Sequence, residues 1–432
     1  MLRNFFTRRF DFERNGTTIK KEMLAGTVSF FTIVYIIAVN SLILSEAGIP
    51  VEAGIIATIL ASFFGCVLMG ILGNAPILLV PGMGINALFV YTIVQSLGLS
   101  WQEALAVVFT SGILFSIIAF TRLSDLLSRA IPHALKEAIT VGLGLFLTLI
   151  GLEKGGLVTR GENSMIALGN LGDPHVQATL LTLVITLFLF MRNVKANFLL
   201  SILFGTFIAY LFGLLDMHEL KNTAFSFEPY KNVFGAMSFA SMTSLAFWIA
   251  VFSLTMVLVF ENIGLVHGHT AMLKQPEKYR RSLQANALSA LSCAFFGTSP
   301  TVSTVESATG IAAGGRTGFT AVTAGVLFLA SAFFIPVIKL IPSSAIAPIL
   351  MIIGALMLQH IKNIELNDFS EWFPAFVIIV MIPFTYSIAD GIAFGFILYP
   401  LLKIAVGKTK EVSVPLVTVS LLFLMNFVFH II

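Results

Sequence analysis

Long apolar runs, separated by short polar segments, make up most of this chain. Runs of about 18–25 apolar residues are long enough to cross a bilayer as helices. A polar stretch, Asp216 to Lys231, divides the predicted spans into two sets of seven. A last apolar run, 413–431, is either one more membrane helix or a segment packed along the bundle. The fourteen spans are expected near 23–46, 53–73, 77–97, 101–121, 132–152, 176–191, 196–215, 243–265, 281–297, 300–313, 318–340, 343–360, 371–388 and 389–406.

Composition agrees with a membrane protein throughout its length. Of the 432 residues, 57% are hydrophobic and only 11% are charged, and the mean hydropathy is +0.96. An ordinary soluble domain carries about 25% charged residues. The sequence therefore predicts an all-α, polytopic (multi-pass) membrane protein.

The distribution of basic residues predicts the orientation. When the N-terminus is placed inside, most Lys and Arg residues fall on the cytoplasmic side, as the positive-inside rule requires. Residues 1–22 are polar and lack the apolar core of a signal peptide, so we expect a cytoplasmic N-terminal segment. The basic residues set orientation in the cytoplasmic (inner) cell membrane, and nothing indicates a nucleic-acid partner. With the N-terminus inside, five basic residues fall on the outer side of the membrane: Lys154, Arg160, Lys221, Lys231 and Lys339.

The two sets of seven spans resemble each other. "GNAP" at 73–76 opens the third span and "GTSP" at 297–300 opens the tenth. "IPHALKEAITVGLGLFL" from Ile131 and "IPSSAIAPILMIIGALML" from Ile341 start the fifth and twelfth spans. Because seven is odd, the second set enters the membrane from the opposite side. This is an inverted repeat, typical of secondary transporters, whose binding sites lie near the bilayer midplane.

The third and tenth spans have the composition of broken helices. "ILLVPGMGINALFVY" (77–91) has Pro and Gly at its centre, and "TSPTVSTVESATGIAAGG" (298–315) is rich in Thr, Ser and Gly. Non-helical backbone at membrane depth persists only where protein or a cavity satisfies its polar groups. Each span is therefore predicted to be a short extended piece followed by a half-helix. The two extended pieces can pair, so that both half-helix N-termini face a central cavity with partial positive charge.

Two intramembrane acids are the strongest candidates for function. Glu306 is expected at the start of the second half-helix, and Glu261 in "LVFENIGLVHG" (258–268) within the eighth span. A carboxylate inside the membrane costs at least about 2.5–3.5 kcal/mol and is a functional candidate by default. The alternatives are a helix cap or an internal hydrogen-bond partner for Glu306, and a snorkelling acid near the end of the span for Glu261. Without an adjacent Lys or Arg, at least one acid is expected to be protonated when the cavity is empty. A proton is then the natural coupling ion.

These groups suit a flat, donor-bearing ligand. A carboxylate accepts two parallel hydrogen bonds, so it matches a ring edge with adjacent N–H groups, as nucleobases have. Asn86 begins the other half-helix and could read a ring edge, or it could simply be that helix's N-cap. Gly82 and Gly84 would permit close backbone approach. An anion carrier on the same plan would need the helix N-termini without the acids.

Other chemistry is not indicated. Cys66 and Cys293 are interpreted as buried core residues, with no disulfide framework. His267 and His269 are expected just after the eighth span, and a metal site needs more ligands than these two. No nucleophile–base pair or metal cluster stands out, so an enzyme, a metal site and an organic cofactor are not predicted.

At this point the chain resembles a known family. "PGMGINALF" in the third span, "GTSPTVSTVESATGIAAGGRTG" around the tenth and the opening "RRFDFERNGTTIKKEMLAGTVSFFTIVYIIAVN" are similar to the AzgA-like purine permeases of the nucleobase:cation symporter-2 family. The resemblance covers residues 1 to about 410. It implies proton-driven import of hypoxanthine, guanine or adenine by an elevator-like cycle. It also implies a core domain (23–121 and 243–340), a gate domain (132–215 and 343–406) and a possible homodimer through the gate, beside the C-terminal segment 413–431.

The resemblance also implies site residues. By position, Glu306 matches the binding glutamate of the tenth span, Asn86 the asparagine of the third, and Glu261 the acid of the eighth, with Glu261 and Glu306 as proton-coupling groups. The typical Phe-Asp-Thr of AzgA-like members is replaced by Phe260-Glu261-Asn262, which is closer to the uracil and xanthine branches. A xanthine or uracil permease is therefore the alternative, and an anion transporter the more distant one. The remaining predicted substrate-binding residues are Gly84, Ile85 (where some relatives have a stacking aromatic), Thr304, Val305 and Ser307.

Overall fold

The computed structural model describes residues 9–124, 131–161, 164, 166–215 and 227–431. The first eight residues of the predicted N-terminal segment, Lys221 and most of the polar stretch after Asp216 lie outside these ranges.

The first seven predicted spans are present, and two of them are interrupted. The first span is two helices joined by a short irregular turn, and the third is a strand followed by a half-helix that continues as a π-helix. Their bounds are α2 Ile19–Ile33 and α3 Ile36–Ser45; α4 Val51–Leu68 with η1 Met69–Gly73; β1 Leu79–Pro81, α5 Met83–Ala87 and η2 Leu88–Ser96; α6 Trp101–Phe120; α8 His133–Lys154; α9 Pro174–Met191; and α10 Asn197–Leu211.

The second seven follow the same plan. The tenth span is again a strand followed by a short helix. The bounds are α13 Leu245–Met272; α14 Tyr279–Phe296; β4 Thr301–Ser303 with α15 Ser307–Ala312; α16 Gly318–Ala330 with η4 Ser331–Phe334 and α17 Ile335–Ile338; α18 Ser343–Leu358 with η5 Gln359–Asn363; α19 Phe369–Thr385; and α20 Ile388–Ala405. Short connecting elements are β2 Val158–Thr159, β3 Ala167–Leu168, α12 Glu228–Lys231, η3 Pro276–Lys278 and η6 Thr409–Glu411, and α21 Val414–Ile431 ends the chain.

The predicted fold class is confirmed. Among the described residues, nine helices are long and apolar enough to cross a membrane, and the broken spans and several other helices are shorter. Many predicted boundaries differ from the observed ones by a few residues, and two of the differences have a clear physical cause. Helix α2 starts at Ile19 instead of 23, because Thr18 caps it by accepting a hydrogen bond from the backbone N–H of Lys21. Helix α13 continues past 265 to Met272, because His269 and Thr270 on its polar end are buried against the protein.

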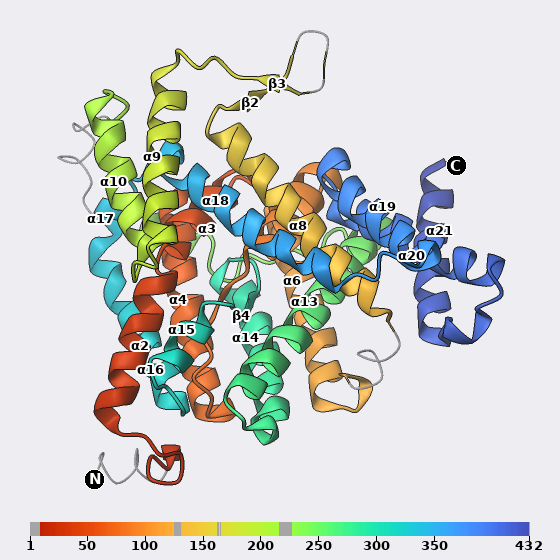
Figure 1. Cartoon of the computed structure of the whole chain (residues 1–432), viewed down its shortest axis with the longest axis horizontal. Helices are drawn as coiled ribbons and strands as arrows, with labels where there is room; N and C mark the ends of the chain where they lie inside the picture. The colour runs from red at the N-terminus through yellow and green to blue at the C-terminus, as the bar shows by residue number, and fades with distance from the viewer. Residues whose placement is uncertain (1–8, 125–130, 162–163, 165, 216–226, 432) are drawn as a thin grey trace.

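The helices pack in two groups (Figure 1). Helices α2, α3, α4, α6, α13, α14 and α16 pack mainly against one another, as do α8, α9, α10, α18, α19 and α20. The groups meet where α10 contacts α2, α8 contacts α5 and α13, and α13 contacts α20. The groups contain the helices predicted for the core and gate domains, and movement of one against the other stays a prediction.

The C-terminal apolar run forms a helix that packs on α20 of the second group and also contacts α13 of the first. Helix α21 packs on α20, where the Ser420 hydroxyl donates to the backbone carbonyl of Phe396. Phe252 and Phe423 meet edge to face, with ring centroids 5.0 Å apart. The structure shows α21 packed against the bundle, and a membrane-spanning role for 413–431 stays a prediction.

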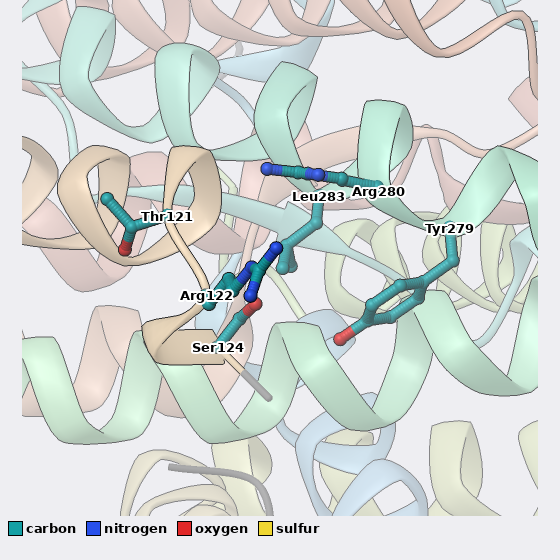
Figure 2. A pocket seen from close by; sticks show the side chains of 6 residues that line it. All are labelled: Thr121, Arg122, Ser124, Tyr279, Arg280 and Leu283. Atoms are coloured by element: carbon teal, nitrogen blue, oxygen red, sulfur yellow. The ribbon is translucent and has the colours of Figure 1, made fainter. Parts of the chain in front are cut away.

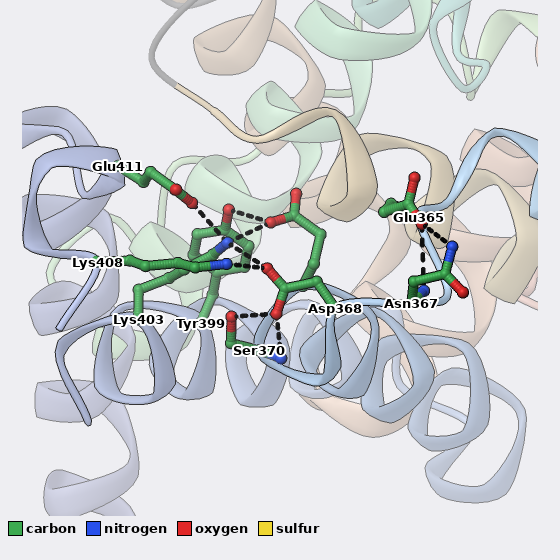
Figure 3. A network of polar contacts seen from close by, with 9 residues as sticks. Glu365, Asn367, Asp368, Ser370, Tyr399, Lys403, Lys408 and Glu411 are labelled. Carbon is green, nitrogen blue, oxygen red and sulfur yellow. Dashed lines mark hydrogen bonds and ion pairs between the residues drawn. The ribbon is translucent and has the colours of Figure 1, made fainter. Parts of the chain in front are cut away.

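A buried lysine joins the ends of α19, α20 and η6 (Figure 3). Lys403 is 1% exposed, and its Nζ lies 2.6 Å from carboxylate oxygens of both Glu371 and Glu411. The Tyr399 hydroxyl donates to Glu371 over 2.9 Å. Hydrogen bonds from Lys408 and Ser370 hold the pKa of Asp368, which caps α19, well below its usual range. Opposite charges therefore satisfy this buried lysine, as burial of a charge requires.

Glu22 is a structural acid that the sequence did not distinguish from the polar lead-in. It is fully buried on α2, and its carboxylate accepts hydrogen bonds from the backbone N–H groups of Arg316 (2.8 Å) and Thr317 (3.3 Å). The Thr320 hydroxyl donates to the same carboxylate over 2.6 Å. A carboxylate at a helix N-terminus is stabilised by the unpaired N–H groups there. Glu22 therefore fastens the first span to the start of α16.

Replacing Glu22 should destabilise the protein. Glu22→Leu leaves buried N–H groups without an acceptor, which costs about 1–3 kcal/mol of unfolding free energy. We expect a lower midpoint of thermal unfolding in detergent micelles. Glu13→Leu is the matched control, because Glu13 is exposed. Equal midpoints for the two variants would contradict the role of Glu22.

Candidate substrate-binding site

Two strands from opposite halves of the chain pair at the centre of the molecule. Strands β1 and β4 are antiparallel, and the register places Leu79 opposite Ser303, Val80 opposite Val302 and Pro81 opposite Thr301. All six residues are buried. Figure 1 shows β4 in the middle of the bundle. The pairing of the two broken spans that the sequence predicted is confirmed.

Neighbouring helices supply the remaining hydrogen bonds of these strands. The backbone N–H of Leu78 donates to the Ser307 hydroxyl over 3.0 Å, so each broken span supports the other. The backbone N–H of Ser303 donates to Asn262 Oδ1 over 3.0 Å. The backbone N–H of Thr301 donates to Cys293 Sγ over 3.3 Å. Backbone polar groups at membrane depth need such partners, since no water is available in the hydrocarbon.

Asparagines from the first and eighth spans hold the tenth span at two points. Asn40 Nδ2 donates to the hydroxyls of Thr58 (2.7 Å) and Thr298 (3.0 Å), just before β4. Asn262 accepts from Ser303 at the end of β4, and the Asn286 amide donates to the same oxygen. Because these amides are buried, the extended segment has one defined position.

Glu306 occupies the N-cap position of α15, immediately after the strand. It is half-buried, and the Tyr35 hydroxyl donates to its Oε1 over 2.7 Å. Its carboxylate does not cap α15, so the structure gives it no intrahelical role. The predicted position is confirmed and the cap interpretation is wrong. The hydrogen bond from Tyr35 agrees with the alternative of an internal hydrogen-bond partner, so a ligand-binding role for Glu306 stays a prediction.

Tyr35 connects this carboxylate to the second group of helices. It lies in the break between α2 and α3 and is 2% exposed. Its ring meets Phe198 of α10 edge to face, with centroids 5.1 Å apart. The Tyr35 hydroxyl therefore contacts the Glu306 carboxylate, and the Tyr35 ring contacts Phe198 of the second helix group.

Glu261 lies on an open face of α13. It is half-buried, and within the described residues its Oε2 has no hydrogen-bond partner. A Cβ added at Gly264 or Gly268 would meet no atom within 4 Å. These residues are three and seven positions after Glu261, so they share its helix face. The space beside Glu261 therefore extends along α13 toward the end of the bundle where α2 begins.

The two acids belong to elements in direct contact. Helix α13 packs against both β4 and α15. Asn262, next to Glu261, binds Ser303, which is three residues before Glu306. Neither carboxylate forms an ion pair with the described lysines and arginines. Among the described residues, the site thus offers carboxylate acceptors that are not paired with a lysine or arginine.

Asn86 has a different place from the one predicted. Gly82 is the N-cap of α5, so Asn86 lies inside the half-helix, and the N-cap interpretation is wrong. It is fully buried, and its Oδ1 accepts from the Ser299 hydroxyl, which joins the two broken spans. Its Nδ2 has no partner among the described residues. Contact between Asn86 and a ligand stays a prediction.

The other predicted residues divide into exposed and buried ones. Val305, at the turn between β4 and α15, is 65% exposed. Thr304, Ser307 and Ile85 are buried, and the Ser307 hydroxyl is occupied by Leu78. A Cβ at Gly84 would lie 2.9 Å from Leu143 Cδ1 of α8, so this glycine permits close contact with the second helix group.

His269 was expected just after the eighth span, and the structure corrects this. It lies inside α13, is 3% exposed, and its Nδ1 is 3.1 Å from the Ser303 hydroxyl. Tyr35 and Asn262 were not singled out either. The asparagine stands beside Glu261 in an apolar run, and this intramembrane polarity was the available signal. Tyr35 carried no such signal, because tyrosine is common in apolar segments.

Solved structures with the same fold are membrane transporters. The transmembrane domain of the cyanobacterial bicarbonate transporter BicA superposes with a TM-score of 0.61 at 13% identity, covering 89% of this chain and 96% of that one. Murine solute carrier 26 family member A9, an anion transporter in the inward-facing state, gives a TM-score of 0.66 at 12% identity, covering 90% and 69%. The molecule thus has the fold of a seven-plus-seven membrane transporter.

Sequence comparison identifies the family. The model of the Permease family (Xan_ur_permease) matches residues 20–394. Nucleobase transporter PlAzg2 of Paenibacillus larvae is 52% identical over 385 residues, 88% of this chain and 77% of that protein. Guanine/hypoxanthine permease PbuO of Bacillus subtilis is 37% identical, covering 96% and 98%. Adenine permease AdeP of Escherichia coli is 34% identical, covering 98% and 96%. The chain belongs to this permease family, which confirms the resemblance and the prediction that it is not an enzyme.

The open face of α13 predicts selective thiol labelling. Cys66 and Cys293 are fully buried, so the folded wild-type protein should resist a polar maleimide. A cysteine at Gly268 would point into open space, and Gly268→Cys should react at least about ten times faster than the native thiols. The measurement is the mass shift of folded protein in detergent. An unreactive Gly268→Cys, with full labelling after denaturation, would show that the face is closed.

Proposed function

We propose that this permease imports purine nucleobases, namely hypoxanthine, guanine and adenine, together with protons through an elevator-type cycle. The observation that carries the proposal is Glu306. It stands at the junction of strand and half-helix, is held by Tyr35, and lies beside the helix that carries Glu261.

The chemistry of the site suits a purine. The Glu306 carboxylate accepts hydrogen bonds, and a purine ring has adjacent N–H donors along its edge. Glu261 adds a second acceptor with one oxygen unpartnered. The exposed turn at Val305 brings backbone groups to the same place. A basic side chain, which an anionic substrate would require, pairs with neither acid in the described structure.

Proton coupling follows from the same two acids. A carboxylate without a basic partner is costly as an anion at membrane depth. Binding a proton at Glu261 removes that charge, and a nucleobase held by Glu306 offsets the cost at the second acid. Proton and base therefore stabilise the loaded site together, and no other cofactor is needed.

The names of the relatives support a purine substrate. PbuO is named a guanine/hypoxanthine permease and AdeP an adenine permease. Glu261-Asn262, in place of the typical Asp-Thr, is the feature that keeps a xanthine or uracil substrate as the alternative. A permease for xanthine or uracil would use the same site and the same proton coupling.

One end of the interface between the helix groups is closed by polar contacts, which supports alternating access. Lys154 at the end of α8 forms an ion pair with Glu46 after α3, and the Tyr91 hydroxyl donates to the same carboxylate over 2.9 Å. The rings of Phe146 and Tyr386 meet edge to face, with centroids 5.4 Å apart, beside Tyr91. The open face of α13 lies toward the other end. We assign the open end to the cytoplasm, where the N-terminus and most basic residues are expected.

In the proposed cycle, the first helix group moves and the second stays fixed. The first group would carry both half-helices, and hence the site, as one body along the second group. The second group would remain fixed in the membrane and provide the surface for a homodimer. The close contact between Gly84 and Leu143 lies on the proposed sliding surface.

The direct test is uptake of labelled bases. A host without its own nucleobase permeases would express the wild type or Glu306→Gln, and hypoxanthine, adenine, guanine, xanthine and uracil would be supplied at two external pH values. We expect purine uptake that rises at acid pH and falls to background in Glu306→Gln. The amide retains the shape of the side chain but replaces one acceptor with a donor.

Each outcome has a definite meaning. Uptake of uracil or xanthine alone would contradict the purine assignment but retain the mechanism. Purine uptake without pH dependence, when a proton ionophore is also without effect, would contradict proton coupling. No uptake of any base by well-expressed protein would contradict the proposed function.

Tyr35 should affect the apparent affinity of the same site for the transported base. Tyr35→Phe keeps the ring against Phe198 but removes the hydrogen bond to Glu306, and hydrogen bonds to charged groups contribute about 1.5–3 kcal/mol. We expect the apparent KM for the transported base to rise about tenfold or more. Tyr399→Phe is the matched control, because it removes a Tyr–Glu hydrogen bond in the Lys403 network instead. An unchanged KM for Tyr35→Phe would show that the hydroxyl does not position Glu306.

A further inference from the structure

A cavity with two arginines in its lining lies away from the candidate site, at the end of the bundle where α2 begins. It has a volume of about 260 Å³ and is bounded by the end of α6 and the start of α14 (Figure 2). Its lining residues are Thr121, Arg122, Ser124, Tyr279, Arg280 and Leu283.

Two guanidinium groups dominate the cavity. Arg122 and Arg280 are exposed, and Figure 2 shows both side chains beside the hollow. Arg280 Nη2 donates to the carbonyl of Phe120 over 3.3 Å, which fixes its direction and leaves other N–H groups of the fork. Neither arginine pairs with a carboxylate among the described residues. The positive end of the α14 dipole adds to the same field.

The walls of the cavity have a defined shape. The Tyr279 ring packs edge to face against His267, with centroids 5.9 Å apart. Leu283 and Ser124 also line the cavity and are buried. The Thr121 hydroxyl already donates to the carbonyl of Ile117 over 2.7 Å. The two arginines are therefore the charged groups of the cavity that can bind an anionic ligand.

An apolar stripe on α6 leads directly to this cavity. Ile113, Ile117 and Phe120 are 39%, 48% and 48% exposed. The spacing of four and three residues places them on one face of the helix, and Thr121 continues that face into the cavity. In the membrane this stripe faces acyl chains, so a molecule with a phosphate at one end and hydrocarbon at the other fits both surfaces.

We propose that Arg122 and Arg280 bind the phosphate of an anionic membrane phospholipid whose acyl chain lies along α6. The planar forks of arginine match phosphate oxygens in pairs. Basic pockets between membrane helices on the cytoplasmic side are suited to anionic head groups. A free phosphate ion would make the same contact with the arginines. The apolar stripe on α6 is the feature that favours a lipid. The proposal requires only that the chain lies in a membrane, and it is independent of the transported substrate.

The occupied site would stabilise the helix that holds the central strand. Helix α14 carries Cys293, Ser289 and Asn286, which contact β4 or its partner Asn262. Helices α6 and α14 pack extensively on each other. A lipid bound to both at one end adds a link between them, and we expect a higher midpoint of thermal unfolding when the lipid is present.

The test uses the full chain purified in a neutral detergent. Phosphatidylglycerol, phosphatidylcholine and inorganic phosphate are titrated separately. Bound lipid is counted by native mass spectrometry, and the unfolding midpoint is recorded. The variants are Arg122→Gln, Arg280→Gln and the double variant. Arg281→Gln is the matched control, because Arg281 is exposed next to Arg280 but does not line the cavity.

We expect phosphatidylglycerol to bind and to raise the midpoint for the wild type and for Arg281→Gln. Binding should weaken about fivefold or more for each cavity arginine removed. Without lipid, all variants should have nearly the wild-type midpoint, because both arginines are exposed and the bond from Arg280 to the Phe120 carbonyl is long and exposed. Equal effects of phosphatidylcholine, or equal binding by the double variant, would overturn the proposal. A full shift with inorganic phosphate alone would overturn the assignment to a lipid.

Discussion

The backbone of two broken membrane spans must find hydrogen-bond partners inside the protein, and the rest of the structure depends on this requirement. Strands β1 and β4 meet it partly by pairing with each other. The remainder comes from side chains: Ser307 for Leu78, Asn262 for Ser303 and Cys293 for Thr301. The small and polar composition of the tenth span, and the polar residues of the helices around it, serve this purpose.

The same constraint places the candidate chemistry. Where the paired strands end, the chain turns into α15, and Glu306 stands at that turn. Because the strand is held by Asn40 before it and Asn262 after it, the carboxylate has a defined position. Tyr35 then links it to the helix group on the other side of the interface. The contacts that support the strand backbone therefore also fix the position of the candidate site.

Local signals in the sequence were enough for the spans, the two half-helices and the position of Glu306, because composition and intramembrane charge are visible in a short window. Contacts between distant segments were not predictable in this way. Tyr35 and Glu306 are 271 positions apart. His269 was misplaced because its burial depends on Ser303, and Asn86 because Gly82 caps the half-helix instead. Glu22 looked like one more polar residue of the lead-in until the backbone of Arg316 and Thr317 was placed beside it.

The Glu22 contact has a consequence for biosynthesis. Its backbone partner at Arg316 is 294 residues downstream, and Leu78 must wait for Ser307, 229 residues later. During translation the first set of spans is inserted while its buried carboxylate and its interrupted backbone still lack their partners. Each half of the repeat therefore needs the other half to complete its buried hydrogen bonds. Until the tenth and eleventh spans emerge, these polar groups have to be satisfied by something other than their final partners, because leaving them buried and unpaired is costly.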